Sequence, residues 1–174
     1  NRDRYLITGS CGKGNWATIP WIAIFDKTIT TSATEGYYIV ILFDAKMEGY
    51  YLSLNQGYTW YRNNFNNNKE IQEKIAFMSK KIRKELGLDE TQIDLKTDSS
   101  LANGYELGNI YSNYYQNESN QKIKDDIWNM LDLLYKTEQI IGEDWKKYNF
   151  NNLNIASKIT NTSHENFGED VLIS

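Results

Sequence analysis

The sequence holds few of the residues on which several protein classes depend. It has one cysteine and one histidine in 174 residues. A single cysteine forms no internal disulfide, and a single histidine excludes a histidine-rich metal site. No apolar run approaches the roughly 20 residues of a membrane-spanning helix. We therefore expect a reduced, cytoplasmic domain that folds around an apolar core.

An excess of basic charge is also absent. The chain has 19 basic and 23 acidic side chains, a net charge of −4, which argues against a uniformly basic protein that coats nucleic acid. The charge is divided unevenly, because residues 1–87 carry 12 basic and 8 acidic side chains, whereas residues 88–174 carry 7 and 15. Any surface that faces an anion is therefore expected in the first half.

The first 60 residues are typical of β-structure. Short apolar or aromatic segments predict strands at Tyr5–Thr8, Pro20–Phe25, Tyr37–Phe43 and Tyr50–Leu54. The third segment is β-branched and aromatic throughout, so it is expected to be a central strand buried on both faces. A turn at Lys46–Gly49 joins it to the next strand as an antiparallel hairpin. If the strands pair, Trp21 meets Leu42 or Tyr38 on one surface of the sheet.

Two helices are predicted after the strands. Apolar residues recur at helical spacing from Ile71 to Leu86 and from Ile123 to Ile141, with Gly87 and Gly142 as stops. Residues 104–115 are tyrosine-rich and are expected to be irregular. The fold class is α+β, a twisted, mostly antiparallel sheet with flanking helices. We expect a single domain over residues 1–174, with a core at about 5–135 and a C-terminal extension at about 142–174.

Enzymatic signatures are weak. The glycine-rich segment Gly9–Gly14 lacks the Gly-Lys-Ser/Thr ending of a nucleotide-binding loop. Cys11 and His164 are the residue types of a nucleophile and its base, but the loop around Cys11 has no other feature of a catalytic site. Asp44, Lys46, Glu48 and Gln56 resemble a scattered nuclease centre, but Asp44 and Lys46 lie at a turn. We expect no catalytic residues, no metal site and no cofactor in this chain.

Several motifs are similar to those of the N-terminal domain of McrB-type, modification-dependent restriction proteins, the MrcB-like family. The motifs are Gly12-Lys13-Gly14-Asn15-Trp16, Ile19-Pro20-Trp21-Ile22-Ala23, Gly36-Tyr37-Tyr38-Ile39-Val40, Tyr51-Leu52-Ser53-Leu54-Asn55-Gln56-Gly57 and Gly104-Tyr105-Glu106-Leu107-Gly108-Asn109-Ile110-Tyr111. The resemblance runs from about Tyr5 to Tyr135. It implies a DNA-binding domain that extrudes a modified cytosine from the duplex into a protein pocket.

The resemblance also implies roles for individual residues. Trp21 and Leu42 match pocket walls for the extruded base, Tyr105 matches a third wall, and Tyr38 lies on the same face as Leu42. Ser10, Gly12, Lys13, Gly14, Asn15 and Trp16 form the expected DNA-contacting loop. Lys13 departs from the pattern, because the family places an aromatic residue there to fill the gap left by the base. A lysine can pair with phosphate but cannot stack as a ring does.

The implied function is that of a non-catalytic specificity domain in a restriction system. The expected partners are double-stranded DNA with a modified base, 5-methylcytosine or 5-hydroxymethylcytosine first, and a fused or associated AAA+ GTPase motor or nuclease. Neither is encoded here, so the chain is expected to work within a larger assembly. The alternatives are a subunit with its own endonuclease activity, a reader of N4-methylcytosine or N6-methyladenine, and a protein- or RNA-interaction module on the same scaffold.

Overall fold

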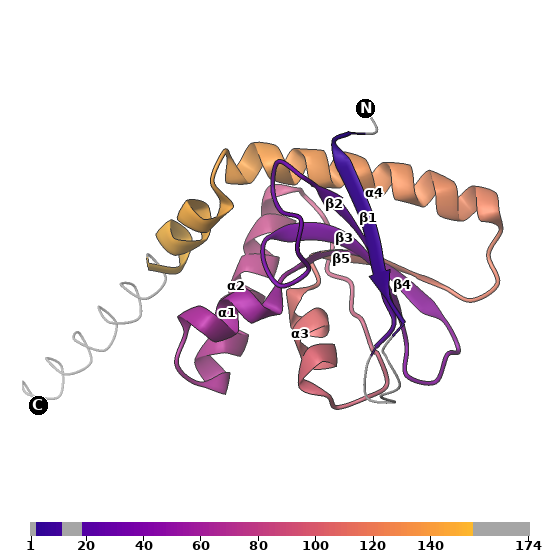
Figure 1. Cartoon of the computed structure of the whole chain (residues 1–174), viewed down its shortest axis with the longest axis horizontal. Coiled ribbons are helices and arrows are strands. Elements are labelled where there is room, and N and C mark those ends of the chain that lie inside the picture. The colour runs from indigo at the N-terminus through magenta and orange to yellow at the C-terminus, as the bar shows by residue number, and fades with distance from the viewer. Residues whose placement is uncertain (1–2, 12–18, 155–174) are drawn as a thin grey trace, which may run out of the picture.

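The computed structural model describes residues 3–11 and 19–154 (Figure 1). Within these ranges a five-stranded sheet has the spatial order β1-β2-β3-β4-β5, and every neighbouring pair is antiparallel. The strands are β1 (Tyr5–Ser10), β2 (Trp21–Asp26), β3 (Tyr37–Phe43), β4 (Tyr50–Gln56) and β5 (Tyr111–Tyr115). The α+β prediction is confirmed, and β3 is the central strand.

The helices are α1 (Tyr58–Asn64), α2 (Asn68–Glu85), α3 (Ser100–Gly108) and α4 (Asn120–Ile141). Helices α2, α3 and α4 each begin with a side-chain cap, which accepts a hydrogen bond from a backbone N–H of the first turn. The capping residues are Asn67, Ser99 and Ser119. Gly87 and Gly142 have positive φ just beyond α2 and α4, which confirms both predicted stops. No helix in the described ranges is long and apolar enough to span a bilayer.

The prediction that residues 104–115 are irregular is wrong. The segment contains the end of α3 and all of β5. The helix has only 9 residues, and its two glycines interrupt the apolar pattern. The strand Tyr-Ser-Asn-Tyr-Tyr pairs with β4 along one edge only, and it has little of the apolar alternation of a strand that covers a core.

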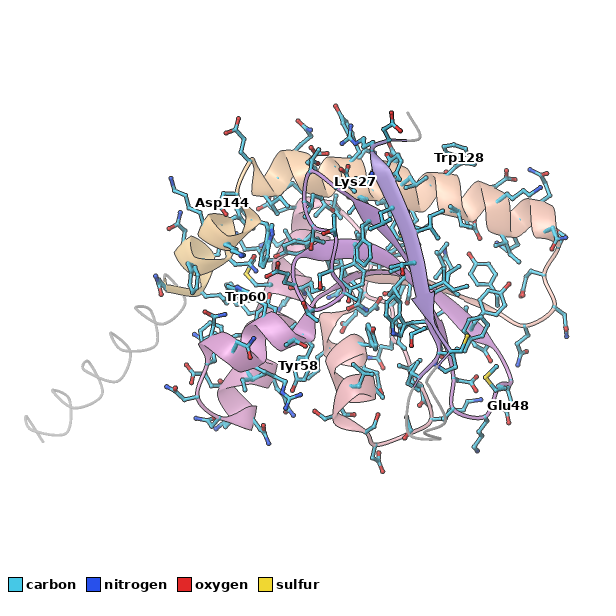
Figure 2. The ribbon with its side chains drawn as sticks, viewed as in Figure 1. Lys27, Glu48, Tyr58, Trp60, Trp128 and Asp144 are labelled. Atoms are coloured by element: carbon cyan, nitrogen blue, oxygen red, sulfur yellow. The ribbon has the colours of Figure 1, made fainter. Side chains whose placement is uncertain are left out.

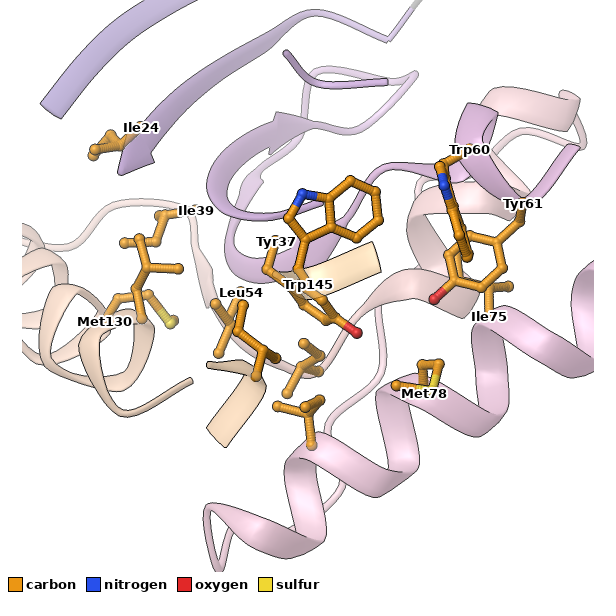
Figure 3. Close-up of a cluster of buried hydrophobic side chains, with 14 of the residues drawn as sticks. Ile24, Tyr37, Ile39, Leu54, Trp60, Tyr61, Ile75, Met78, Met130 and Trp145 are labelled. Carbon is orange, nitrogen blue, oxygen red and sulfur yellow. The ribbon is translucent and has the colours of Figure 1, made fainter. Parts of the chain in front are cut away.

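One face of the sheet, called here the α4 face, supports the larger core. Ile24, Tyr37, Ile39, Leu52 and Leu54 from the strands pack with residues of α1, α2 and α4. Figure 3 shows Tyr61, Ile75 and Met78 meeting the strand residues from the helices. Burial of these side chains is the main source of stability for the domain.

The opposite face, called here the α3 face, supports a second and smaller core. Alternate residues of β2 and β3 point to it, and they pack with Ile93 and Leu95 of the segment between α2 and α3 and with Ala102 and Tyr105 of α3. The strand residues are Ala23, Phe25, Tyr38, Val40 and Leu42. The predicted alternation of β2 and β3 therefore separates the two faces as expected.

Part of the predicted C-terminal extension is packed onto the sheet. Residues 145–154 are helical, and Trp145, Asn149 and Leu153 are buried. The Trp145 ring lies 5.4 Å from that of Trp60, next to Tyr37 in Figure 3. The Tyr37 hydroxyl donates to Asn149 Oδ1 at 2.6 Å. The α4 face thus includes chain beyond the last residue of α4.

Candidate nucleic-acid interface

The two residues expected to form the first pocket walls, Trp21 and Leu42, are neighbours on adjacent strands and lie on the same face of the sheet. Trp21 begins β2 and is paired with Leu42 near the end of β3. Leu42 is fully buried, whereas Trp21 is half-buried at the margin of the second core. Leu42 is therefore part of the buried core on the α3 face, and Trp21 is the member of this pair that solvent reaches.

Tyr38 and Tyr105 lie in the same cluster as Leu42. Tyr38 is fully buried, and its hydroxyl donates to the backbone carbonyl of Ala33 at 2.8 Å. Tyr105 is 5% exposed. Burial raises the pKa of Tyr105 to about 12, and burial together with Tyr105 raises the pKa of Tyr38 well above its usual value. Both phenols are therefore neutral hydrogen-bonding groups at physiological pH.

Two glycines determine where Tyr105 lies. A β-carbon on Gly104 would come within 2.5 Å of the Tyr58 ring, and one on Gly108 would come within 2.5 Å of Asn55 Oδ1. Only residues without a side chain let α3 approach α1 and β4 this closely. The Gly104-Tyr105-Glu106-Leu107-Gly108 motif thus acts as a packing element that presents Tyr105 to the sheet.

A buried polar network joins α3 to β4 beside the tyrosine. Asn55 Nδ2 donates to the backbone carbonyl of Tyr105 at 2.9 Å and to Ser53 Oγ at 3.0 Å. Ser53 Oγ donates to Asn109 Oδ1 at 2.8 Å, and Asn109 Nδ2 donates to the carbonyl of Thr91 at 3.0 Å. All of the buried side-chain nitrogen and oxygen atoms in the described residues have hydrogen-bond partners. A satisfied network of this kind fixes one arrangement of the helix on the strand.

Sequence reasoning missed the positioning role of Asn55 and Asn109. A signal was present, because Ser53 and Asn55 occupy alternate positions of β4 that face a core. Polar residues at such positions need buried partners. The position of α3, which supplies the partner carbonyl, could not be read from the sequence pattern.

The predicted DNA-contacting loop is described only at its start. Ser10 ends β1 and is paired with Trp21. Gly12, Lys13, Gly14, Asn15 and Trp16 lie outside the described residues. The loop nevertheless starts and ends beside the Trp21–Leu42 pair, since β1 and β2 are adjacent antiparallel strands.

Asp44, one of the two carboxylates of the nuclease-like pattern, has a structural role. Asp44 is fully buried and accepts the backbone N–H groups of Lys46, Glu48 and Gly49 at 2.9, 3.1 and 3.0 Å. It therefore shapes the β3–β4 turn. In the described part of the chain no cluster of three histidine, cysteine or acidic residues could hold a metal ion. Cys11 is exposed, and His164 lies outside the described residues.

A family model described as "MrcB-like, N-terminal domain" matches residues 1–139. The chain belongs to the MrcB-like N-terminal domain family. The match confirms the resemblance inferred from the sequence motifs and covers all five strands and nearly all of α4. No curated protein and no solved structure matches the chain. Membership of this family indicates a DNA-binding role in a restriction system.

Proposed function

We propose that this domain reads DNA that carries a modified base and holds that base, extruded from the duplex, against the α3 face. Trp21, Leu42 and Tyr105 would form the walls, with Tyr38 behind them. The observation that supports this most is the pairing of half-buried Trp21 with fully buried Leu42, next to the loop that carries the family motif. Such a pair offers a partly exposed aromatic side chain beside a buried apolar one.

The energetics suit a reader of small modifications. Extruding a base costs a few kcal/mol, which contact with aromatic and apolar walls offsets. A buried methyl group adds about 0.8 kcal/mol, or roughly a fourfold change in affinity. Methylation would therefore shift a nearly balanced competition between the stacked and the extruded base. We assign 5-methylcytosine or 5-hydroxymethylcytosine as the first candidates.

The remaining affinity would come from phosphate contacts of the loop and from a larger assembly. Lys13 would pair with phosphate, while Ser10 and Asn15 would donate hydrogen bonds and Gly12 and Gly14 would allow close approach of the backbone. A chain with a net charge of −4 gains little from nonspecific attraction. A fused or associated AAA+ GTPase or nuclease would add avidity and carry out cleavage.

A binding screen tests the proposal. The chain is titrated against duplexes that differ at one base: cytosine, 5-methylcytosine, 5-hydroxymethylcytosine, N4-methylcytosine, and adenine against N6-methyladenine. We expect at least a fourfold preference for one of the 5-substituted cytosines. Equal affinity for all duplexes would contradict the reader function, and a preference for another modification would reassign the base.

The same samples test the nuclease alternative. Each duplex is incubated with the chain and Mg²⁺, and the products are separated on a denaturing gel. We expect binding without strand cleavage. Cleavage that requires Mg²⁺ and the modified base would assign endonuclease activity to this chain.

A further inference from the structure

The two edges of the sheet differ in how they are covered. At the β5 edge the Ser112 N–H donates to Thr91 Oγ1 at 2.8 Å, so the segment between α2 and α3 covers part of that strand. At the other edge β1 pairs with β2 alone among the described strands (Figure 1). In an antiparallel strand the N–H and C=O groups of alternate residues point to opposite sides, so β1 has one set of groups available for pairing with a further strand.

The β1 strand lacks the features by which edge strands usually prevent such pairing. Its sequence, Tyr-Leu-Ile-Thr-Gly-Ser, contains no charged residue and no proline. Charged side chains and proline are common on natural edge strands because they oppose pairing with another chain. Residues 6–9 are all exposed, and the side chain of Ile7 is 68% exposed. An uncharged and exposed edge of this kind favours the addition of a strand.

An uncovered apolar surface lies beside this edge on the α4 face. Ile7 and Gly9 belong to this face, because Ile7 is paired with Ile24 of the larger core. Ile22, which is paired with Gly9, is 39% exposed. A hollow of about 430 Å³ is lined there by Gly9, Ile22 and Phe43 among others. The end of β1 therefore borders an apolar space that the described residues leave open.

The strand is complementary to a second copy of itself. Two copies of β1 can pair antiparallel with Ile7 opposite Ile7, which places Tyr5 of each copy opposite Gly9 of the other. Tyr5, Ile7 and Gly9 lie on the same face because they alternate along the strand. Each Tyr5 ring would then cover the glycine of the other copy, next to the apolar hollow. No like charges meet in this arrangement, because the strand has none.

We infer that this chain forms a dimer through β1, in which the sheets of two copies join edge to edge into one continuous antiparallel sheet. The twofold axis passes between the two Ile7 residues, perpendicular to the sheet. The α3 faces of both copies therefore point to the same side of the joined sheet. The inference goes beyond the proposed function and does not depend on it.

Sedimentation velocity of the chain without DNA, over a series of concentrations, tests the dimer. Wild type should shift from monomer to dimer as the concentration rises, because a strand-edge interface is small and reversible. Ile7→Lys should raise the dissociation constant of the dimer by about tenfold or more, because two lysines would lie opposite each other. Phe77→Lys is the matched control, since it adds the same charge at an exposed position of α2, and it should associate as wild type does.

Disulfide cross-linking tests the register. The single native cysteine is first replaced by Cys11→Ser. In this background Ile7→Cys should form a covalent dimer under mild oxidation, because directly paired residues have Cα atoms about 4.5–5.5 Å apart, within the range of a disulfide. Thr8→Cys, next along the same exposed strand, should cross-link far less, because its two copies would lie beyond the roughly 7 Å limit.

Wild type that stays monomeric over the whole series would overturn the inference and would leave the edge to a strand of another protein. Association that is unchanged in Ile7→Lys, or lost equally in Phe77→Lys, would also overturn it. Equal cross-linking of Ile7→Cys and Thr8→Cys would contradict pairing about Ile7. Circular dichroism checks that each variant is folded.

Discussion

The two faces of the sheet are built in different ways. The α4 face is a broad core to which several helices and the segment 145–154 contribute, and Gln56 forms buried hydrogen bonds with Tyr61 and Ser79 at its margin. The α3 face is smaller, has a short helix, and places the buried Ser53–Asn55–Asn109 network beside the candidate site residue Tyr105. Apolar packing tolerates small rearrangements, whereas a hydrogen-bonded network requires one geometry. The larger core therefore supplies most of the stability, and the network beside Tyr105 fixes the position of the candidate site.

The largest loss of stability is expected from Leu54→Ala on the α4 face. Leu54 is fully buried, and its truncation should reduce the free energy of unfolding by about 2–5 kcal/mol. Urea unfolding measures the change. Leu101→Ala, at an exposed position of α3, should change it by no more than about 0.5 kcal/mol. Folded Leu54→Ala should keep the preference for modified DNA, and loss of that preference would break the division between the faces.

A smaller loss of stability and a larger loss of recognition are expected from Asn55→Ala. The substitution removes the donor to the Tyr105 carbonyl and the acceptor of Gln56 N–H. Unsatisfied buried groups should cost about 1–3 kcal/mol, and Tyr105 should lose its fixed position. The ratio of dissociation constants for unmodified and modified duplex should fall toward one.

Asn64→Ala is the matched control for that experiment. Asn64 is exposed, and its side chain donates only to the Trp60 carbonyl within α1 among the hydrogen bonds of the described residues. The variant should keep the wild-type ratio. If Asn55→Ala keeps it as well, the network has no role in positioning the base site.

The smallest effect is expected where the sheet edge is tied to α4. Arg4 donates to the buried Asp26 carboxylate at 2.8 Å and also contacts Glu138. Burial alone would raise the pKa of Asp26, but hydrogen bonds from Arg4 and Thr28 hold it below its usual value. Since Arg4 is partly exposed and keeps Glu138, Asp26→Asn should cost only about 1 kcal/mol.

The pH dependence of that loss has a definite sign. A carboxyl whose pKa is lower in the folded state contributes stability above its unfolded pKa, and this contribution is lost as the pH falls through the folded pKa. The difference in melting temperature between wild type and Asp26→Asn should therefore be present at pH 7 and shrink below about pH 4. Asp132→Asn, in an exposed pair with Lys136, should show almost no difference at either pH. A difference that grows on acidification would contradict the assignment.

The division of strand residues between the two faces could largely be predicted from the sequence. The alternation of β2 and β3 predicted that Trp21 faces the same side as Leu42 and Tyr38, and glycines 87 and 142 predicted where the long helices end. These patterns depend on local periodicity. The place of Tyr105 does not, because it depends on a short helix whose glycines remove the apolar pattern and on a carbonyl that meets Asn55 across 50 residues. The turn at Lys46–Gly49 was predicted, but the buried Asp44 carboxylate that accepts three backbone N–H groups within it was not, because that role depends on burial rather than on periodicity.

The most direct test of the account is the effect of Trp21→Ala on discrimination between duplexes that differ by one modified base. Trp21 is half-buried at the margin of the α3 face, so the variant should stay folded, which circular dichroism checks. We expect wild type and Trp128→Ala, which removes an exposed aromatic side chain of α4 (Figure 2), to prefer the modified duplex by about fourfold or more, and Trp21→Ala to bind both duplexes equally. A folded Trp21→Ala variant that keeps the wild-type preference would contradict the assignment of Trp21 to the base site.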